Sequence, residues 1–264
     1  MKAAEFAARV RRRETVVGYW IQLDSPSSTE RVAALGYDYV SLDAQHGLFG
    51  YSGMLAALTA IDAAGRAVGL VRVAANDATA IGRALDAGAA GVIAPLVNTA
   101  EDAAVTVAAG RYPPVGVRSY GPTRSMMRIG PTPAEADSSV VLLAMIETSE
   151  GLANVEAIAA TPGLDGLYIG PSDLHIAVGG AGPADPAVAD AFEAALVRIR
   201  RACDANGIAA GLHTRSGEEA AKRITEGFTF LTVAGDLVHL EAAAAAHLAA
   251  VDRQRVSGTP PMTQ

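Results

Sequence analysis

The sequence has few of the features that mark secreted, membrane-spanning or nucleic-acid-binding proteins. Cys203 is the only cysteine among 264 residues, which excludes an internal disulfide and a cysteine-cluster metal site. No stretch approaches the roughly 18 consecutive apolar residues that a membrane span requires. Lys and Arg number 21 against 28 Asp and Glu, and this net charge of −7 argues against a nucleic-acid surface. The three consecutive arginines at 11–13 are too short a run to change that conclusion.

The N-terminal segment has no apolar core followed by a cleavage site, so it does not resemble a signal peptide. The spacing of Phe6 and Val10 predicts an amphipathic surface helix there. Half of the residues are apolar and only 19 % are charged, which argues against disorder. We therefore expect a soluble cytoplasmic protein with no nucleic-acid or membrane partner.

Short apolar runs alternate along the chain with helix-like stretches of about 10–20 residues. The runs predict eight strands at residues 16–23, 39–43, 67–73, 91–97, 140–147, 164–170, 208–213 and 228–234. The stretches between them predict helices near residues 28–36, 52–64, 77–87, 99–110, 149–160, 186–206, 217–226 and 237–255. Only residues 112–139, rich in Pro and Gly, are expected to be long and irregular.

Eight strands that are each followed by a helix indicate a (β/α)8 TIM barrel, here with an extra N-terminal helix. A doubly wound open sheet is the alternative, but the first strand leads into LDSPSS rather than into a Gly-rich phosphate loop. We expect residues 1–264 to form one domain, with the barrel core at about 16–255 and a flexible tail at 256–264.

Polar side chains follow most of the predicted strands, at the carboxyl ends where barrels of this kind carry their active sites. They comprise Asp24, Asp43, Gln45, His46, Arg72, Glu147, Ser172, Asp173, His213 and Asp236. Arg118 and Arg124 belong to the long irregular stretch at the other end, so we interpret them as structural or intersubunit residues. Cys203 fits a core position in a helix.

Each of these residues has a functional and a structural interpretation. Glu147 and Asp173 follow neighbouring strands and could hold a hard divalent cation, but either could instead cap a helix or form a salt bridge. His46 could act as a base near neutral pH or be an exposed loop histidine. Arg72 ends an apolar strand and needs either a substrate oxyanion or a structural carboxylate. The turn Gly170-Pro171-Ser172-Asp173 could bind a carboxylate or be an ordinary tight turn.

Several longer motifs stand out along the chain. They are YVSLDAQHG at 39–47, LVRV at 70–73, LDAGAAGVIAPLVNTAEDA at 85–103, RYPPVGVRSYGPTR at 111–124, AMIETSEGLANVEAIAATPGLDGLYIGPSDL at 144–174 and FLTVAGD at 230–236. These motifs resemble those of the HpcH/HpaI aldolase family, the metal-dependent class II pyruvate aldolases that cleave or form 4-hydroxy-2-oxoacids. The resemblance covers roughly residues 16–249.

The resemblance implies a divalent metal, such as Mg²⁺, Mn²⁺ or Co²⁺, held by Glu147 and Asp173. It implies that the 2-oxoacid chelates this metal and that its carboxylate is held at the 170–173 turn. Substrate binding would involve Gly170, the backbone N–H groups of Ser172 and Asp173, and Arg72.

The resemblance also implies that Arg72 steadies the keto oxygen as it becomes an enolate. His46 corresponds to the family's base, with Asp43 and Asp86 supporting it through hydrogen bonds. The last helix is expected to pack on a neighbouring subunit of a homo-oligomer, commonly a hexamer built as a trimer of dimers.

Two residues depart from the family pattern. Gln45 stands where many members have Glu, and Met145 stands where many have Gln. Both changes leave the aldehyde partner open. No lysine follows a predicted strand, so a Schiff-base mechanism lacks its nucleophile, and this favours a metal enolate independently of the resemblance.

Two other functions remain alternatives to the aldolase. The same enolate chemistry could serve an oxaloacetate decarboxylase or a CoA-ester lyase like those of the citrate-lyase-like barrels. A degenerate barrel that binds 2-oxoacids without turning them over is the other alternative.

Overall fold

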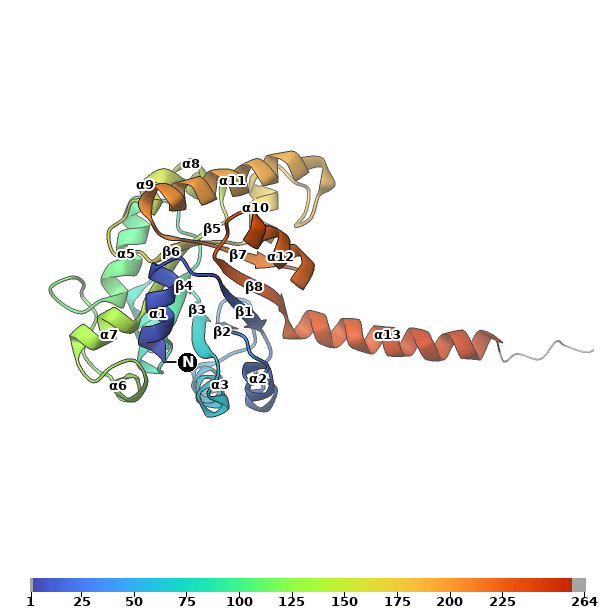
Figure 1. The fold of residues 1–264 in the computed structure, drawn as a ribbon, viewed down its shortest axis with the longest axis horizontal. Coiled ribbons are helices and arrows are strands. Elements are labelled where there is room, and N and C mark those ends of the chain that lie inside the picture. Colours follow the sequence, from blue (N-terminus) through green and yellow to red (C-terminus); the bar gives the residue numbers. More distant parts are fainter. Residues whose placement is uncertain (1, 258–264) are drawn as a thin grey trace, which may run out of the picture.

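Eight parallel strands close into a barrel in the order β1 to β8, with β8 pairing back to β1 (Figure 1). The computed structural model describes residues 2–257, with side chains described to residue 251. The strands are β1 Val16–Ile21, β2 Tyr39–Asp43, β3 Val68–Arg72, β4 Gly91–Ala94, β5 Val141–Ile146, β6 Gly166–Ile169, β7 Ala209–Thr214 and β8 Phe230–Gly235. The predicted (β/α)8 barrel and its eight strands are confirmed.

Helices surround the barrel, and their ends follow the local sequence. They are α1 Ala3–Arg11, α2 Pro26–Ala33, α3 Tyr51–Ala64, α4 Ala78–Asp86, α5 Ala100–Gly110, α6 Ser125–Arg128, α7 Pro133–Ser139, α8 Ser149–Ala153, α9 Val155–Ala159, α10 Pro171–Ala177, α11 Ala189–Asn206, α12 Gly217–Thr225 and α13 Asp236–Ser257, with a short 3-10 helix at Pro186–Val188. Thr99 and Asp102 form a capping box at the start of α5. Gly207 ends α11 in the left-handed conformation that glycine adopts most easily.

Helix α1 is the amphipathic helix that the sequence predicts, with Glu5 and Arg11 exposed, and its apolar face closes the amino-terminal end of the barrel. Phe6 is fully buried against the aromatic side chains of Tyr39 and Phe230, with ring centroids 5.8 and 6.2 Å away. Val10 belongs to the same apolar cluster, which fills the inside of the barrel. The spacing of apolar residues correctly predicted the helix, but it could not reveal that its partner was the end of a barrel.

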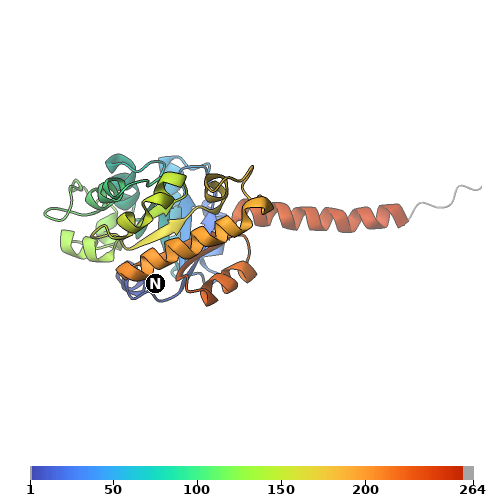
Figure 2. The same ribbon diagram turned by 90° about the horizontal axis from the view of Figure 1, so that it is seen from above.

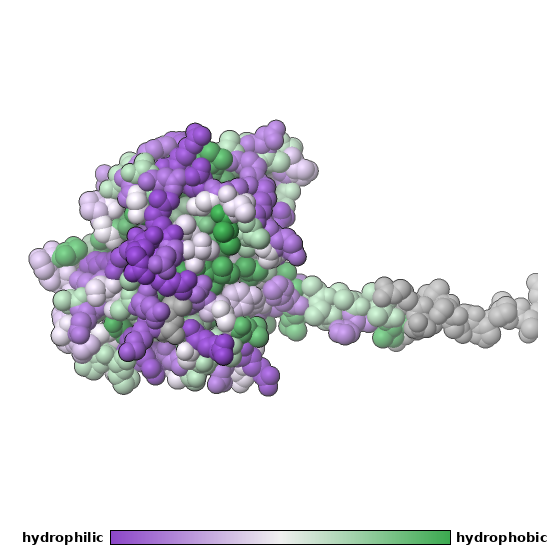
Figure 3. Space-filling model, viewed as in Figure 1, coloured by the Kyte–Doolittle hydropathy of each residue, from purple (hydrophilic) through white to green (hydrophobic). Residues whose placement is uncertain are grey.

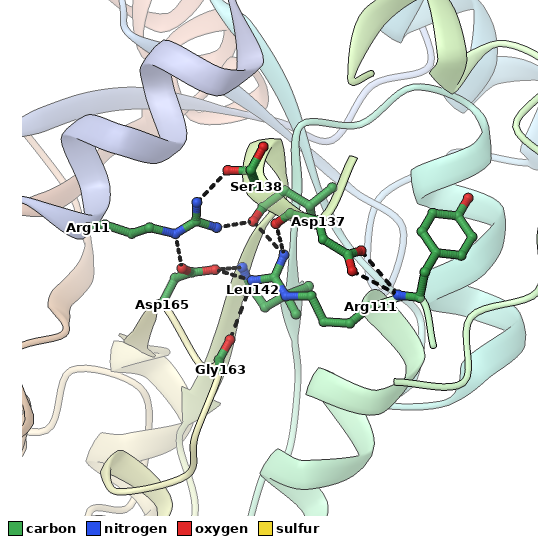
Figure 4. Close-up of polar contacts among 9 residues, drawn as sticks. Arg11, Arg111, Asp137, Ser138, Leu142, Gly163 and Asp165 are labelled. Carbon is green, nitrogen blue, oxygen red and sulfur yellow. Dashed lines mark hydrogen bonds and ion pairs between the residues drawn. The ribbon is translucent and has the colours of Figure 1, made fainter. Parts of the chain in front are cut away.

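A cluster of two arginines and one aspartate holds α1 and the chain after α5 to this closed end (Figure 4). Asp165, just before β6, accepts hydrogen bonds from Arg11 Nε at 2.7 Å and from Arg111 Nη2 at 2.9 Å. It also accepts one from the backbone amide of Leu142, at 2.8 Å. The cluster therefore ties three segments that are distant in sequence to one buried carboxylate.

Three local predictions are corrected by the structure. Residues 112–139 are not wholly irregular, since they contain α6 and α7. The turn expected after β6 is the helix α10, and the helix expected at 149–160 is split into α8 and α9. These helices have only four to seven residues each, too short for a hydrophobic repeat to be recognised.

Helix α13 extends away from the barrel in both ribbon views (Figures 1 and 2). It continues through residues 256 and 257 of the predicted tail, and residues 258–264 lie outside the described part of the chain. Among the described residues, no helix is both long and apolar enough to span a membrane.

Candidate active site

A cavity of about 240 Å³ opens at the carboxyl ends of the strands. Residues from β1, β3, β5, β6, β7 and β8 contribute to it, together with the loop after β2 and the first turns of α10 and α13. The lining residues are Trp20, Gln22, His46, Arg72, Met145, Tyr168, Gly170, Pro171, Ser172, Asp173, His213, Gly235 and Val238. Of the ten polar residues that the sequence predicted at the strand ends, the cavity wall contains five: His46, Arg72, Ser172, Asp173 and His213.

Asp43 and Arg72 form a buried ion pair at the ends of β2 and β3. The guanidinium donates from Nε to Oδ1 at 2.9 Å and from Nη2 to Oδ2 at 2.5 Å. The backbone amides of Gln45 and His46 also donate to Oδ1, each at 3.1 Å. Asp43 thus fixes the guanidinium of Arg72 directly. It also fixes the loop that carries His46, but it does so by contacting the backbone of His46 and not its imidazole.

Burial alone would raise the pKa of Asp43, but the hydrogen bonds and charge of Arg72, with the His46 amide and the Trp20 indole, hold it below its ordinary value. Trp20 donates from Nε1 to Asp43 Oδ2 at 3.2 Å, and its ring lies 5.0 Å from the guanidinium carbon of Arg72. Trp20 is not among the site residues predicted from the sequence. It is the only tryptophan of the sequence and lies on a predicted strand, so it could have been considered as a candidate.

Glu147 lies just after β5 and is 97 % buried without a salt bridge among the described residues. Its Oε1 accepts the backbone amide of Leu96 at 2.8 Å, and Leu96 has the positive φ of 54° that is uncommon for residues other than glycine. A Cβ at Gly170 would lie 2.5 Å from Glu147 Oε2. The backbone at Leu96 therefore binds this carboxylate, and the absence of a side chain at Gly170 leaves room for it.

Asp173 lies in the first turn of α10, exposed and close enough to Glu147 to affect its charge. Burial raises the pKa of Glu147, and the negative charge of Asp173 raises it further. The amides of Ser172 and Asp173 are in the turn where a helix leaves its N–H groups without intrahelical acceptors. Asp173 and the two amide donors therefore lie at the cavity, and Glu147 lies against Gly170 of its wall.

These two carboxylates fit a divalent cation better than they fit a purely structural role. Burial and the charge of Asp173 disfavour the ionised form of Glu147 and outweigh the Leu96 amide and the charge of Arg72, so a cation beside the two acids would be favourable. Within the described chain no three side chains of His, Cys, Asp or Glu gather to form a complete metal site. A cation held by Glu147 and Asp173 would therefore need water or substrate oxygens as further ligands, as is usual for Mg²⁺.

His46 is exposed at the rim of the cavity, and no hydrogen bond of its imidazole is found within residues 2–257. Its neighbour Gln45 has a buried side-chain oxygen, Oε1, that lacks a partner there. Met145, the other departure from the family pattern, is buried and forms part of the cavity wall.

Asp86 does not support His46 within this chain, contrary to the expectation. It is the last residue of α4, and because α4 leads back to the start of β4, its carboxyl end lies at the closed end of the barrel. There Asp86 accepts a hydrogen bond from Arg118 Nη2 at 2.6 Å. Arg124 donates to the backbone oxygen of Ala87 at 2.7 Å, so both arginines have the structural contacts that the sequence suggested.

Asp236 also has a structural role. Its two carboxylate oxygens accept the backbone amides of Gln22 and Leu23 at 2.9 and 3.0 Å, which joins the start of α13 to the end of β1. Tyr168 and Val238 line the cavity without having been predicted. Tyr168 comes from a strand position with no polar pattern, and Val238 could not be placed before the direction of α13 was known.

Comparison with known proteins identifies the family. The model of the HpcH/HpaI aldolase/citrate lyase family matches residues 16–243. The chain belongs to this family. A HpcH/HpaI aldolase/citrate lyase family protein from Burkholderia cenocepacia has the same fold, with a TM-score of 0.86 and 30 % identity over 94 % of this chain and 99 % of that one.

Characterised relatives are aldolases. The hydroxypyruvate/pyruvate aldolase of Rhizorhabdus wittichii is 41 % identical over 85 % of this chain and 89 % of its own length. The 4-hydroxy-2-oxovalerate aldolase of Rhodococcus jostii is 39 % identical over 89 % of this chain and 91 % of its own. The chain is accordingly a lyase of the aldolase type.

Proposed function

We propose that the protein is a divalent-metal-dependent class II aldolase that interconverts 4-hydroxy-2-oxoacids with an aldehyde and pyruvate or a related 2-oxoacid. One observation carries the proposal. Asp173 lines one cavity with the guanidinium of Arg72, which Asp43 holds in place, and a second carboxylate, that of Glu147, lies against Gly170 of the cavity wall.

Arg72 has the position and the free donor needed to bind the keto oxygen. Its Nε and Nη2 are used by Asp43, while its Nη1 makes no hydrogen bond to any described residue and the side chain lines the cavity. Cleavage of the bond between C3 and C4 leaves negative charge on the keto oxygen, which a preorganised guanidinium stabilises.

The carboxylate of the substrate fits the first turn of α10. The backbone amides of Ser172 and Asp173 point out of the start of the helix, where an anion is favourably bound. Gly170 leaves the space beside Glu147 and Met145 open, since a Cβ there would meet both side chains within 2.6 Å. A cation held by Glu147 and Asp173 would supply Lewis-acid polarisation of the keto group.

His46 is the proposed base that removes the proton from the C4 hydroxyl during cleavage and returns it during synthesis. It lines the cavity at its rim, where an imidazole can exchange protons with water. None of the lining residues is a lysine, which agrees with an enolate rather than a Schiff-base route.

A direct test measures pyruvate released from 4-hydroxy-2-oxopentanoate, first with EDTA and then with Mg²⁺, Mn²⁺ or Co²⁺. We expect turnover only with metal, and its loss in His46→Ala. If oxaloacetate is decarboxylated while the 4-hydroxy acid is untouched, and His46→Ala keeps that activity, the protein is a decarboxylase instead. Binding of oxalate with metal but no turnover of either acid would indicate a degenerate barrel.

We also propose that α13 packs against a second copy of the chain in a homo-oligomer, with a hexamer built as a trimer of dimers as the expected assembly. Between residues 237 and 251 only His239, Glu241 and His247 are polar, and the helix projects from the barrel. Leu240, Leu248 and Val251 are each more than half exposed, and the coloured part of the helix is mostly pale green in Figure 3. Such an apolar surface is unfavourable in water.

Light scattering on the purified full chain tests the assembly. We expect an oligomer for the unmodified protein, a shift toward monomer for Leu248→Glu, and no shift for the control Glu241→Gln. A monomer at micromolar concentration would contradict the proposal.

A further inference from the structure

His213 is a polar residue of the cavity wall that the proposed chemistry does not use. It lies near the carboxyl end of β7, between the strands that carry Tyr168 and Thr232. It lines the 240 Å³ cavity and also an adjoining cavity of about 450 Å³, which shares Pro171, Ser172 and Val238 with the first. Its ring is therefore accessible from both cavities.

The imidazole of His213 has no hydrogen-bond partner among the described residues. Two other histidines do: His175 Nδ1 lies 2.7 Å from the oxygen of Pro171, and His239 Nδ1 lies 2.7 Å from the hydroxyl of Tyr19. His213 instead packs edge-on against Trp20, with ring centroids 5.4 Å apart at 79°. Its orientation is thus fixed by packing, while its ring nitrogens remain available to the cavity.

The ring is neutral at physiological pH. Burial, assisted by the positive charge of Arg72, lowers the pKa of His213 to about 4. A neutral imidazole is a donor at one nitrogen and an acceptor at the other, which is the combination that pairs with a hydroxyl group. A carboxylate ligand would not gain an ion pair from it.

Most of the other polar groups of the site are already assigned to other parts of the substrate. Glu147 and Asp173 belong to the cation side, the amides of α10 to the carboxylate, Arg72 to the keto oxygen and His46 to the C4 hydroxyl. The carbon next to the keto group is the part of the donor that none of these groups contacts, and His213, packed against Trp20, is together with Gln22 a polar side chain of the cavity wall without an assigned partner.

We propose that His213 hydrogen-bonds a hydroxyl group on the carbon adjacent to the keto group of the donor, and so selects a 3-hydroxy-2-oxoacid over pyruvate. This inference rests on the proposed aldolase function. A methyl group at that position would leave the imidazole desolvated and unpaired, and sites built to bind a hydroxyl discriminate strongly against analogues that lack it.

The test compares kcat/KM for hydroxypyruvate and for pyruvate, each with propanal as acceptor and saturating Mn²⁺. We expect the unmodified enzyme to prefer hydroxypyruvate. His213→Leu should lower the ratio of the two values at least tenfold, through loss of hydroxypyruvate turnover while pyruvate is still used. His213→Asn, which keeps a donor and an acceptor, should recover part of the ratio.

Val238→Ala is the matched control, since Val238 lines the same two cavities without a polar group. It should affect both donors equally. An unchanged ratio in His213→Leu, or an equal loss for both donors, would overturn the role of His213 while pyruvate turnover by the unmodified enzyme preserves the aldolase. No turnover of either donor by the unmodified enzyme would overturn both.

Discussion

The two ends of the barrel each contain a buried aspartate paired with arginine, and the two clusters differ in what remains unpaired. At the closed end, Asp165 is paired with Arg11 and Arg111 (Figure 4). At the open end, Asp43 is paired with Arg72. Residue types and burial are alike, so neither can distinguish a structural cluster from a functional one.

The arginines of the closed end donate most of their hydrogen bonds to protein groups. Besides Asp165, Arg111 donates to the backbone oxygens of Asp137 and Val140 at 2.7 and 2.9 Å. Arg11 donates to Val140 at 2.8 Å and also to Ser138. Nη1 and Nη2 of both arginines and Nε of Arg11 all donate to the protein itself, as expected of a cluster that holds the fold together.

The cluster at the open end includes donors that no protein group accepts from. Arg72 uses one edge of its guanidinium on Asp43 and lines a cavity with the remainder. Glu147 and His213 add a carboxylate without a salt bridge and an imidazole without a hydrogen bond among the described residues. The functional end is therefore distinguished by donors and acceptors that have no hydrogen-bond partner, and not by the presence of a buried charge.

Arg72→Ala should have the largest effect. Losing a preorganised donor to the developing negative charge costs roughly 10³-fold in kcat, or about 4 kcal/mol of barrier. The change also leaves Asp43 buried without its counter-charge, so Arg72→Lys is the matched variant that keeps a positive charge but not the two-pronged contact. Steady-state kinetics on both variants checks this, and near-normal kcat in Arg72→Lys would contradict the role assigned to the guanidinium.

Arg111→Ala should reduce stability and spare catalysis. Removing one partner from a buried ion pair costs about 3–5 kcal/mol, and the backbone oxygens of Asp137 and Val140 lose a donor. Urea unfolding measures the loss, and kcat per folded molecule should stay within about twofold of the unmodified enzyme by this argument. A selective loss of kcat would remove the distinction between the two ends.

Gly170→Ala should lower the affinity for the metal more than it lowers the stability of the fold. The added Cβ would lie 2.5 Å from Glu147 Oε2, so the carboxylate must move. A displaced ligand typically costs 10–100-fold in metal affinity. Titration with Mn²⁺ followed by electron paramagnetic resonance gives the affinity directly. Gly182→Ala is the control, because a Cβ there meets no atom within 4 Å.

His213→Leu should make stability less sensitive to acid. The pKa of His213 is lowered from 6.5 to about 4, so the unfolded chain binds the extra proton between these values. Stability from this group is therefore present above about pH 6.5 and lost as pH falls toward 4, amounting to about 1–2 kcal/mol between pH 7 and pH 5. Urea unfolding at both pH values, with and without the substitution, measures the difference. Equal acid sensitivity would mean that the ring is already hydrated.

Most of the fold could be predicted because the alternation of apolar runs and helices repeats eight times. The failures have local causes. Helix α10 begins with Gly170-Pro171, which is also typical of a turn, and α1 has an ordinary amphipathic pattern whose partner only the closed barrel supplies.

The site was partly predictable for the same reason. Parallel strands bring their carboxyl ends together, so Asp43, Arg72 and Glu147 could be assigned to one site from the order of the strands alone. Asp86 could not, since the family motif that names it says nothing about which end of the barrel it occupies in this chain. Leu96 donates a backbone amide, which no side-chain pattern reveals.

The central claim is enolate chemistry at the Glu147–Asp173 end of the cavity. The most direct measurement is exchange of the C3 protons of pyruvate with deuterium, followed by NMR, because it needs no knowledge of the aldehyde. We predict exchange that EDTA abolishes, that Mg²⁺, Mn²⁺ or Co²⁺ restores, and that Glu147→Gln removes. Exchange that persists in EDTA, or that Glu147→Gln leaves unchanged, would contradict the account.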